Sequence, residues 1–188
     1  MKNLEKEFII NSISFPYEEI GEFPDSYSMG NLIKRLIDGL GYRYHWATES
    51  LTESDLSFRV SDGSRTSLET LEHLLAISGF ILRISQGKYN KQLEEDELNF
   101  VQIRQQTLNQ LQEASQLMGQ MKDEDFKSLE ILIKQRDQKI SLPLWIMING
   151  PLSDAIYHTG QIVLLRRISG NPINPNVDIF TGKNKKND

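Results

Sequence analysis

The chain of 188 residues contains no cysteine, and this absence removes several kinds of chemistry at once. Without thiols it can form no disulfide, hold no zinc–thiolate centre and use no cysteine nucleophile. The absence also fits a reducing compartment, so we expect a cytoplasmic protein. Histidine is scarce as well, because the sequence has only three: His45, His73 and His158.

A surplus of positive charge is missing too. The chain has 26 acidic and 21 basic residues, which gives a formal net charge of −5 at pH 7. A polyanion is disfavoured as a partner by this balance, and no basic stripe is visible along the sequence. We therefore expect no nucleic-acid partner.

Long apolar runs are also absent. The most apolar stretch, 74–82, is interrupted by Ser78 and Gly79 and is far shorter than the roughly 18–20 residues that a membrane span needs. The first ten residues mix acidic and basic side chains, and their apolar run Phe8–Ile10 is too short for a signal peptide. We expect neither a signal peptide nor contact with a membrane.

Apolar residues recur at helical spacing in four long segments, and this pattern predicts an all-α protein. Gly150-Pro151 interrupts the last of these segments, where we expect a kink or a fresh helix start. Strands and helices do not alternate, so the sequence predicts a helix bundle rather than an α/β fold. The expected helices cover 28–51, 67–85, 94–118 and 144–169.

The length favours one domain. We expect an irregular lead-in over 1–27, the helical bundle over 28–172 and an irregular tail over 173–188. Segment 129–142 leaves two interpretations open, because a helix through 125–134 also fits. Its apolar residues alternate on either side of a polar turn, as in a β-hairpin: Leu129, Ile131, Ile133, Ile140 and Leu142.

The expected helix 67–85 is apolar on two sides. One stripe includes Leu71 and Leu75, and the other includes His73 and Ile77. A helix of this kind lies deep in a bundle or shares one face with a partner subunit.

Asp154 and His158 are the most informative pair in the sequence. Being four residues apart on a helix, they share one face with Cβ atoms roughly 5–6 Å apart. With His73 from another helix they could form a three-ligand metal site with open positions. Gln161, one turn further on, is predicted to orient a ligand or substrate. A plainer interpretation stays open, with His73 as a core histidine and Asp154 favoured by the helix dipole.

Other polar and aromatic residues receive plainer interpretations. His45 lies off the apolar stripe of its helix, and we interpret it as a rim or surface residue, with a role in the pocket beside Glu49 as the alternative. Arg166-Arg167 is interpreted as a solvated pair, with anion binding near the pocket as the alternative. Both tryptophans are expected to pack against neighbours: Trp46 and Trp145.

Several segments resemble the DinB/YfiT-like superfamily. The last helix of that family is similar to Asn149-Gly-Pro-Leu-Ser-Asp-Ala-Ile-Tyr-His-Thr-Gly-Gln-Ile162 and to Arg166-Arg-Ile-Ser-Gly-Asn-Pro172. Its histidine-bearing helix resembles Thr70-Leu-Glu-His-Leu-Leu-Ala-Ile77. The first bundle helix of one branch resembles Gly41-Tyr-Arg-Tyr-His-Trp-Ala-Thr-Glu-Ser-Leu51. The resemblance covers about 28–172, and its most specific part is the His-Thr-Gly-Gln-Ile run.

The resemblance implies an up-down-down-up four-helix bundle, often dimeric, with a divalent metal held by three histidines. His73 and His158 match the first and last of these, and Asp154 stands where the middle histidine is usual. Two imidazoles and a carboxylate suit Zn, Ni, Fe or Mn. The replacement is equally compatible with a site that has lost its metal.

The resemblance also implies a function. Some relatives are thiol-dependent transferases and others are described as metal-dependent hydrolases, so we expect a metal-dependent enzyme that transfers a small thiol or activates water. The expected partners are a second copy of the chain and a small-molecule thiol or other small substrate. The alternative is a non-enzymatic dimeric helical-bundle module, for interaction or stress response, with a degenerate metal site.

Overall fold

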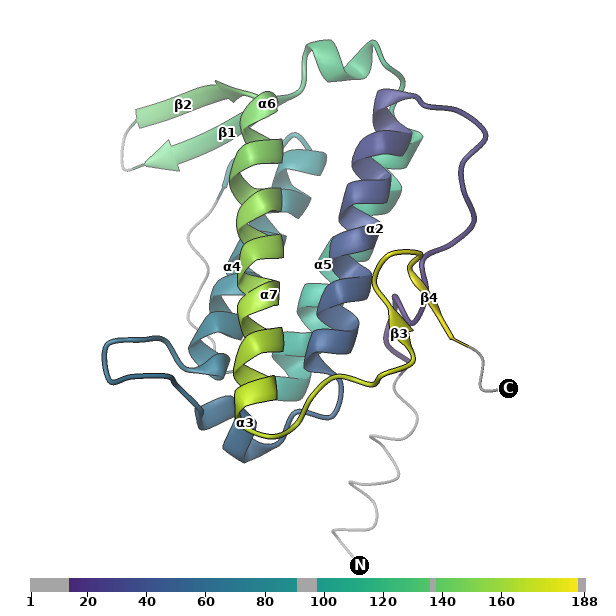
Figure 1. Cartoon of the computed structure of the whole chain (residues 1–188). Coiled ribbons are helices and arrows are strands. Elements are labelled where there is room, and N and C mark those ends of the chain that lie inside the picture. The colour runs from purple at the N-terminus through teal and green to yellow at the C-terminus, as the bar shows by residue number, and fades with distance from the viewer. Residues whose placement is uncertain (1–13, 91–97, 136–137, 186–188) are drawn as a thin grey trace, which may run out of the picture.

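The computed structural model describes residues 14–90, 98–135 and 138–185. It confirms a mostly helical protein that carries a small antiparallel hairpin. Its long helices pack side by side as a bundle (Figure 1). These helices are α2 (Met29–Thr48), α4 (Ser67–Ser85), α5 (Phe100–Gln120) and α7 (Ser153–Ile168).

Contacts between the helices fix their directions. Arg166, near the end of α7, binds backbone carbonyls near the end of α2, so these two helices run the same way. The Ser78 hydroxyl donates to Gln110, and Gln86 donates to Glu113 further along both helices, so α4 and α5 run in the same direction. In Figure 1, α2 and α7 descend while α4 and α5 ascend. The bundle is therefore made of two parallel pairs that run in opposite directions.

Side-chain caps explain where the helices begin. The Ser28 hydroxyl accepts from the Asn31 amide at the start of α2, and Thr66 forms a capping box with Glu69 at the start of α4. Asn99 caps α5, so this helix begins at Phe100 rather than at residue 94 as predicted; residues 94–97 lie outside the described part of the chain.

The predicted first helix, 28–51, is too long at its C-terminal end. Helix α2 stops at Thr48, and Ser50 then has a positive φ of 56°, which a helix cannot contain. A separate five-residue helix, α3 (Glu53–Ser57), follows behind a capping box formed by Thr52 and Asp55.

The alternating segment forms a hairpin, so the helix alternative for 125–134 is wrong. Strands β1 (Glu130–Gln135) and β2 (Gln138–Pro143) pair antiparallel, with Ile131 opposite Leu142. Ile131 is buried against the helical core, which anchors the hairpin to the bundle. The segment between α5 and the hairpin contains the short 3-10 helix η1 (Asp125–Lys127).

The chain is kinked before the last long helix, as Gly150-Pro151 predicts. A short helix α6 (Trp145–Met147) leads into a wide π-type turn, η2 (Ile148–Leu152), in which Gly150 has φ −98° and ψ −107°. Proline cannot donate a backbone hydrogen bond, so the regular ladder is broken here and α7 starts afresh at Ser153.

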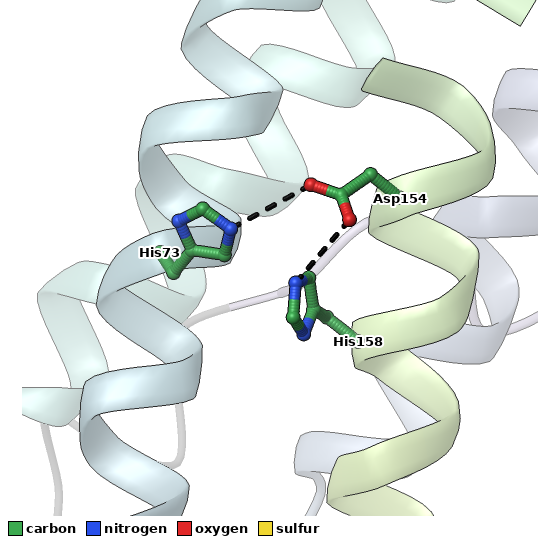
Figure 2. Close-up of side chains that lie close together, drawn as sticks. All are labelled: His73, Asp154 and His158. Carbon is green, nitrogen blue, oxygen red and sulfur yellow. Dashed lines mark ion pairs between the residues drawn. The ribbon is translucent and has the colours of Figure 1, made fainter. Parts of the chain in front are cut away.

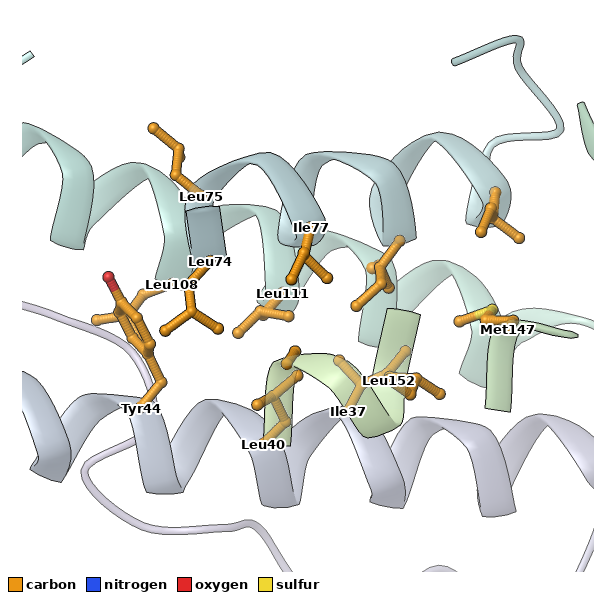
Figure 3. Packing of buried hydrophobic residues seen from close by; sticks show 14 of the residues in the cluster. Ile37, Leu40, Tyr44, Leu74, Leu75, Ile77, Leu108, Leu111, Met147 and Leu152 are labelled. Atoms are coloured by element: carbon orange, nitrogen blue, oxygen red, sulfur yellow. The ribbon is translucent and has the colours of Figure 1, made fainter. Parts of the chain in front are cut away.

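The core lies between all four long helices (Figure 3). Tyr44 and Leu40 of α2 face Leu74 of α4 and Leu108 of α5, and each of these side chains is almost completely buried. Leu152 from the kinked turn closes the same core. Burying aliphatic side chains of this size contributes roughly 1.5–3 kcal/mol each, so the core holds the helix positions on which the site depends.

The tail, expected to be irregular, contains one short antiparallel pairing between β3 (Val177–Asp178) and β4 (Lys183–Asn184). The Ile20 amide donates to the Gly182 carbonyl at 2.8 Å, which joins the lead-in to this tail. The described part of the lead-in, 14–27, contains no helix or strand.

In the described ranges, no helix combines the length and the apolar character needed to cross a membrane.

Candidate metal centre

The structure brings His73, Asp154 and His158 together across the α4–α7 interface (Figure 2). Asp154 and His158 lie one turn apart on α7, and His73 projects towards them from α4. The Asp154 carboxylate faces both imidazoles, with one oxygen towards each ring (Figure 2). Its oxygens are 3.6 Å from His73 Nε2 and 3.3 Å from His158 Nε2. One ligand atom from each residue lies within 4.8 Å of the other two.

These distances fit a divalent ion. Ligands about 2.0–2.2 Å from a tetrahedral zinc are separated by about 3.3–3.6 Å. The distance from each imidazole nitrogen to the carboxylate oxygen that faces it lies in this range. The two imidazole rings stand nearly perpendicular, with centroids 4.7 Å apart, so their Nε2 atoms can face one ion without stacking. The Asp154 side chain is 46% exposed, which leaves room for water or substrate on the open side.

Gln161 fixes the orientation of His158. The side-chain oxygen of Gln161 lies 2.6 Å from His158 Nδ1 and accepts the hydrogen bond that this nitrogen donates. In the neutral tautomer with the proton on Nδ1, Nε2 carries the lone pair and faces Asp154. Metal-binding histidines are commonly oriented by a partner on the second ring nitrogen. Gln161, predicted to orient a ligand or substrate, makes this hydrogen bond to His158.

His73 is partly exposed and faces Asp154, so it is not a core histidine. Burial lowers the pKa of its imidazole, and the charges of Arg65 and His158 act in the same direction, while Asp154 opposes them. The net lowering favours the neutral imidazole near pH 7, and the neutral form is the one that can donate a lone pair to a metal.

An open groove of about 630 Å³ adjoins the centre at Asp154. The sequence gives only weak signals for this groove, because Tyr157 and Ser153 merely adjoin the predicted ligands His158 and Asp154 in the chain. The kinked turn supplies the remaining wall. The groove is lined by Ile77, Phe80, Asn149, Gly150, Pro151, Ser153, Asp154 and Tyr157.

His45 is not a rim or surface residue, and that prediction is wrong. It is only 4% exposed, and its Nδ1 lies 2.8 Å from the Pro16 carbonyl oxygen, to which it donates. Burial lowers the pKa of this imidazole. Neither His45 nor Glu49 belongs to the metal-ligand group among the described residues.

The prediction of a solvated arginine pair is wrong for Arg166, which is 2% exposed, and holds for Arg167, which is exposed. The Arg166 guanidinium donates to the carbonyls of Trp46 and Ala47 at the end of α2. Trp145, expected to pack, is one of the exposed apolar residues, whereas Trp46 is partly buried and donates through Nε1 to the Glu18 carbonyl.

No known family model matches the chain, and neither a curated protein nor a solved structure shows significant similarity to it.

Proposed function

We propose that this protein is a divalent-metal-dependent enzyme of the DinB/YfiT-like type, a small-thiol transferase or a hydrolase. It would hold Zn, Ni, Fe or Mn on His73, Asp154 and His158. The observation that carries the proposal is the convergence of these three side chains at ligand spacing, with Gln161 orienting one of them. The opposed directions of the two helix pairs support the family assignment, since they match the bundle that the resemblance implies.

The residues present define the chemistry. A divalent ion bound here would lower the pKa of a bound water or thiol and so supply a nucleophile near neutral pH. Asp154 would supply a carboxylate oxygen to the ion, and His73 and His158 would each supply an imidazole nitrogen. Gln161 holds the His158 ring in place, while the exposed side of Asp154 gives a substrate access.

The direct test is metal content. The protein, purified without added metal and then exposed to micromolar Zn or Ni, is expected to retain about one ion per chain by plasma mass spectrometry. A His158→Ala variant should lose it, because two ligands bind far more weakly than three. His45→Gln is the matched control, since it removes a histidine outside the centre.

Two outcomes would count against the proposal. Wild-type protein without metal affinity at micromolar concentrations overturns the enzyme assignment. A His158→Ala variant that keeps the wild-type metal content overturns the ligand assignment.

A second candidate function has its own observation. Tyr157, Leu164 and Ile168 lie at helical spacing along α7 and are 66%, 52% and 54% exposed. An exposed apolar stripe of this kind is typical of a protein–protein interface. It favours a dimeric bundle. If the protein is a non-enzymatic interaction module, a chelator should leave its monomer–dimer equilibrium unchanged.

A further inference from the structure

The groove beside Asp154 is lined by apolar side chains from two helical segments. Ile77 and Phe80 of α4 form one side, one and two turns beyond His73. Pro151 from the kinked turn and the ring of Tyr157 lie across from them. A molecule in this groove would therefore touch apolar surface on both sides.

Charge is nearly absent from the groove. Among its described lining residues, Asp154 is the only charged one, and it is also a candidate metal ligand. The neutral polar groups are Asn149 and Ser153. The Ser153 hydroxyl donates to the Ile148 carbonyl at 2.7 Å, so its lone pairs remain able to accept. A charged group placed against Ile77 or Phe80 would lose water without gaining a partner, which is costly.

Size and exposure point to a small organic molecule. The volume of about 630 Å³ lies inside the range of about 300–1,000 Å³ that is usual for ligand sites. Tyr157 is 66% exposed beside the groove, although aromatic side chains stabilise a fold mainly when buried. Its ring stands edge-on to His158 with centroids 5.6 Å apart, which keeps it next to the metal centre.

We propose that this groove binds the uncharged aromatic or branched aliphatic part of a substrate, while a donor atom of the same molecule reaches the metal beside Asp154. The proposal rests on the proposed function, because the metal anchors the substrate. It adds the substrate class: a small neutral molecule with an apolar body, rather than a sugar phosphate or an amino acid.

Hydroxamates test the groove separately from the metal. Acetohydroxamate and benzohydroxamate carry the same metal-binding group and differ in the phenyl ring. In calorimetric titrations of the metal-loaded protein, benzohydroxamate should bind about tenfold tighter, the gain expected from burying roughly 60 Å² of ring. 4-Carboxybenzohydroxamate should lose that gain, because its second charge would meet Ile77 and Phe80.

Variants then locate the ring. Phe80→Leu keeps an apolar side chain against the core, and Tyr157→Ser changes an exposed one. Each should reduce the affinity for benzohydroxamate severalfold while leaving acetohydroxamate binding and metal content unchanged. Leu32→Ser on α2 is the matched control, since Leu32 is exposed but does not line the groove.

The outcomes separate the two proposals. A protein that takes up no metal overturns the proposed function, and the substrate class falls with it. A protein that binds metal and binds both hydroxamates equally, or prefers the carboxylated probe, overturns the substrate class alone. The substrate class is also overturned if benzohydroxamate binds tighter than acetohydroxamate but neither Phe80→Leu nor Tyr157→Ser reduces this preference. The phenyl ring would then lie outside the groove.

Discussion

Asp55 shows how one residue ties distant parts of the chain together. Its carboxylate is 3% exposed and accepts hydrogen bonds from Thr52 at the start of α3. It also accepts from Ser169 at 2.5 Å and from Asn171 at 2.7 Å, both just after α7. Burial alone would raise the pKa of this carboxyl, but these hydrogen bonds to the ionised form outweigh it and lower the pKa to about 2.

This lowered pKa predicts a pH-dependent stability. The folded pKa of about 2 lies below the ordinary value of 3.8, so the stabilisation is fully present above about pH 4 and is lost as the pH falls towards 2. At 1.36 kcal/mol per pKa unit it amounts to about 2 kcal/mol. Asp55→Asn should lower the free energy of unfolding by about this much at pH 7, measured by urea denaturation.

The difference in the free energy of unfolding between the wild type and Asp55→Asn should become smaller as the pH falls from 4 to 2. Asp62→Asn, in an exposed turn, is the control and should change little at any pH. If the difference in unfolding free energy between the wild type and Asp55→Asn stays constant down to pH 2, the pKa of the Asp55 carboxyl is not lowered.

Residue-level prediction from the sequence worked where the relation was local. Asp154 and His158 share a helix face because of their spacing alone. His73 was a candidate from another helix, but only the family resemblance indicated that its helix faces the one that carries Asp154 and His158, because no local rule states which helices meet. His45 and Arg166 were misplaced for the same reason: Pro16 and the end of α2, which bury them, are distant in sequence.

At the scale of elements, two glycines in helices have opposite surroundings. A Cβ on Gly30 of α2 would lie 2.6 Å from the Met118 carbonyl oxygen and 3.0 Å from that of Met121, both backbone atoms at the end of α5. A Cβ on Gly160 of α7 would meet nothing within 4 Å. Helices α2 and α5 therefore depend on a glycine to approach, whereas α7 does not.

The same substitution should thus have opposite effects at these two positions. Gly30→Ala is expected to reduce the free energy of unfolding by about 1–3 kcal/mol, because the backbone of α5 must move. Gly160→Ala should increase it by up to about 1 kcal/mol through higher helix propensity. Thermal or urea unfolding measures both, and a stabilising Gly30→Ala would show that the α2–α5 contact is looser than described.

Elements were predictable where the chain marks its own boundaries. Gly150-Pro151 predicted the kink, and alternating apolar residues predicted the hairpin as one of two interpretations. The start of α5 was missed because Leu98, which precedes the Asn99 cap, still fits the apolar stripe of the helix. The pairing of β3 with β4 was missed because two-residue strands depend on distant support, such as the bond from Ile20 to Gly182.

At the scale of the whole molecule, the exposed apolar stripe of α7 bears on assembly. If a second copy covers it, the double change Leu164→Lys and Ile168→Lys should convert a dimer to a monomer in sedimentation velocity, because buried lysine charges are costly. Phe180→Lys is the control, since Phe180 is 98% exposed but lies in the tail. A wild-type monomer, or a double variant that still dimerises, would rule out this interface.

The candidate ligands are widely separated along the chain. His73 and Asp154 are 81 positions apart (154 − 73), so a shared ion would close a long loop. Such a closure stabilises the folded chain only after both helices have docked, since the ligands are far apart before then. The ion would accordingly bind after the transition state of folding, so it should slow unfolding many times more than it accelerates folding. Stopped-flow folding and unfolding rates with and without metal measure the two effects.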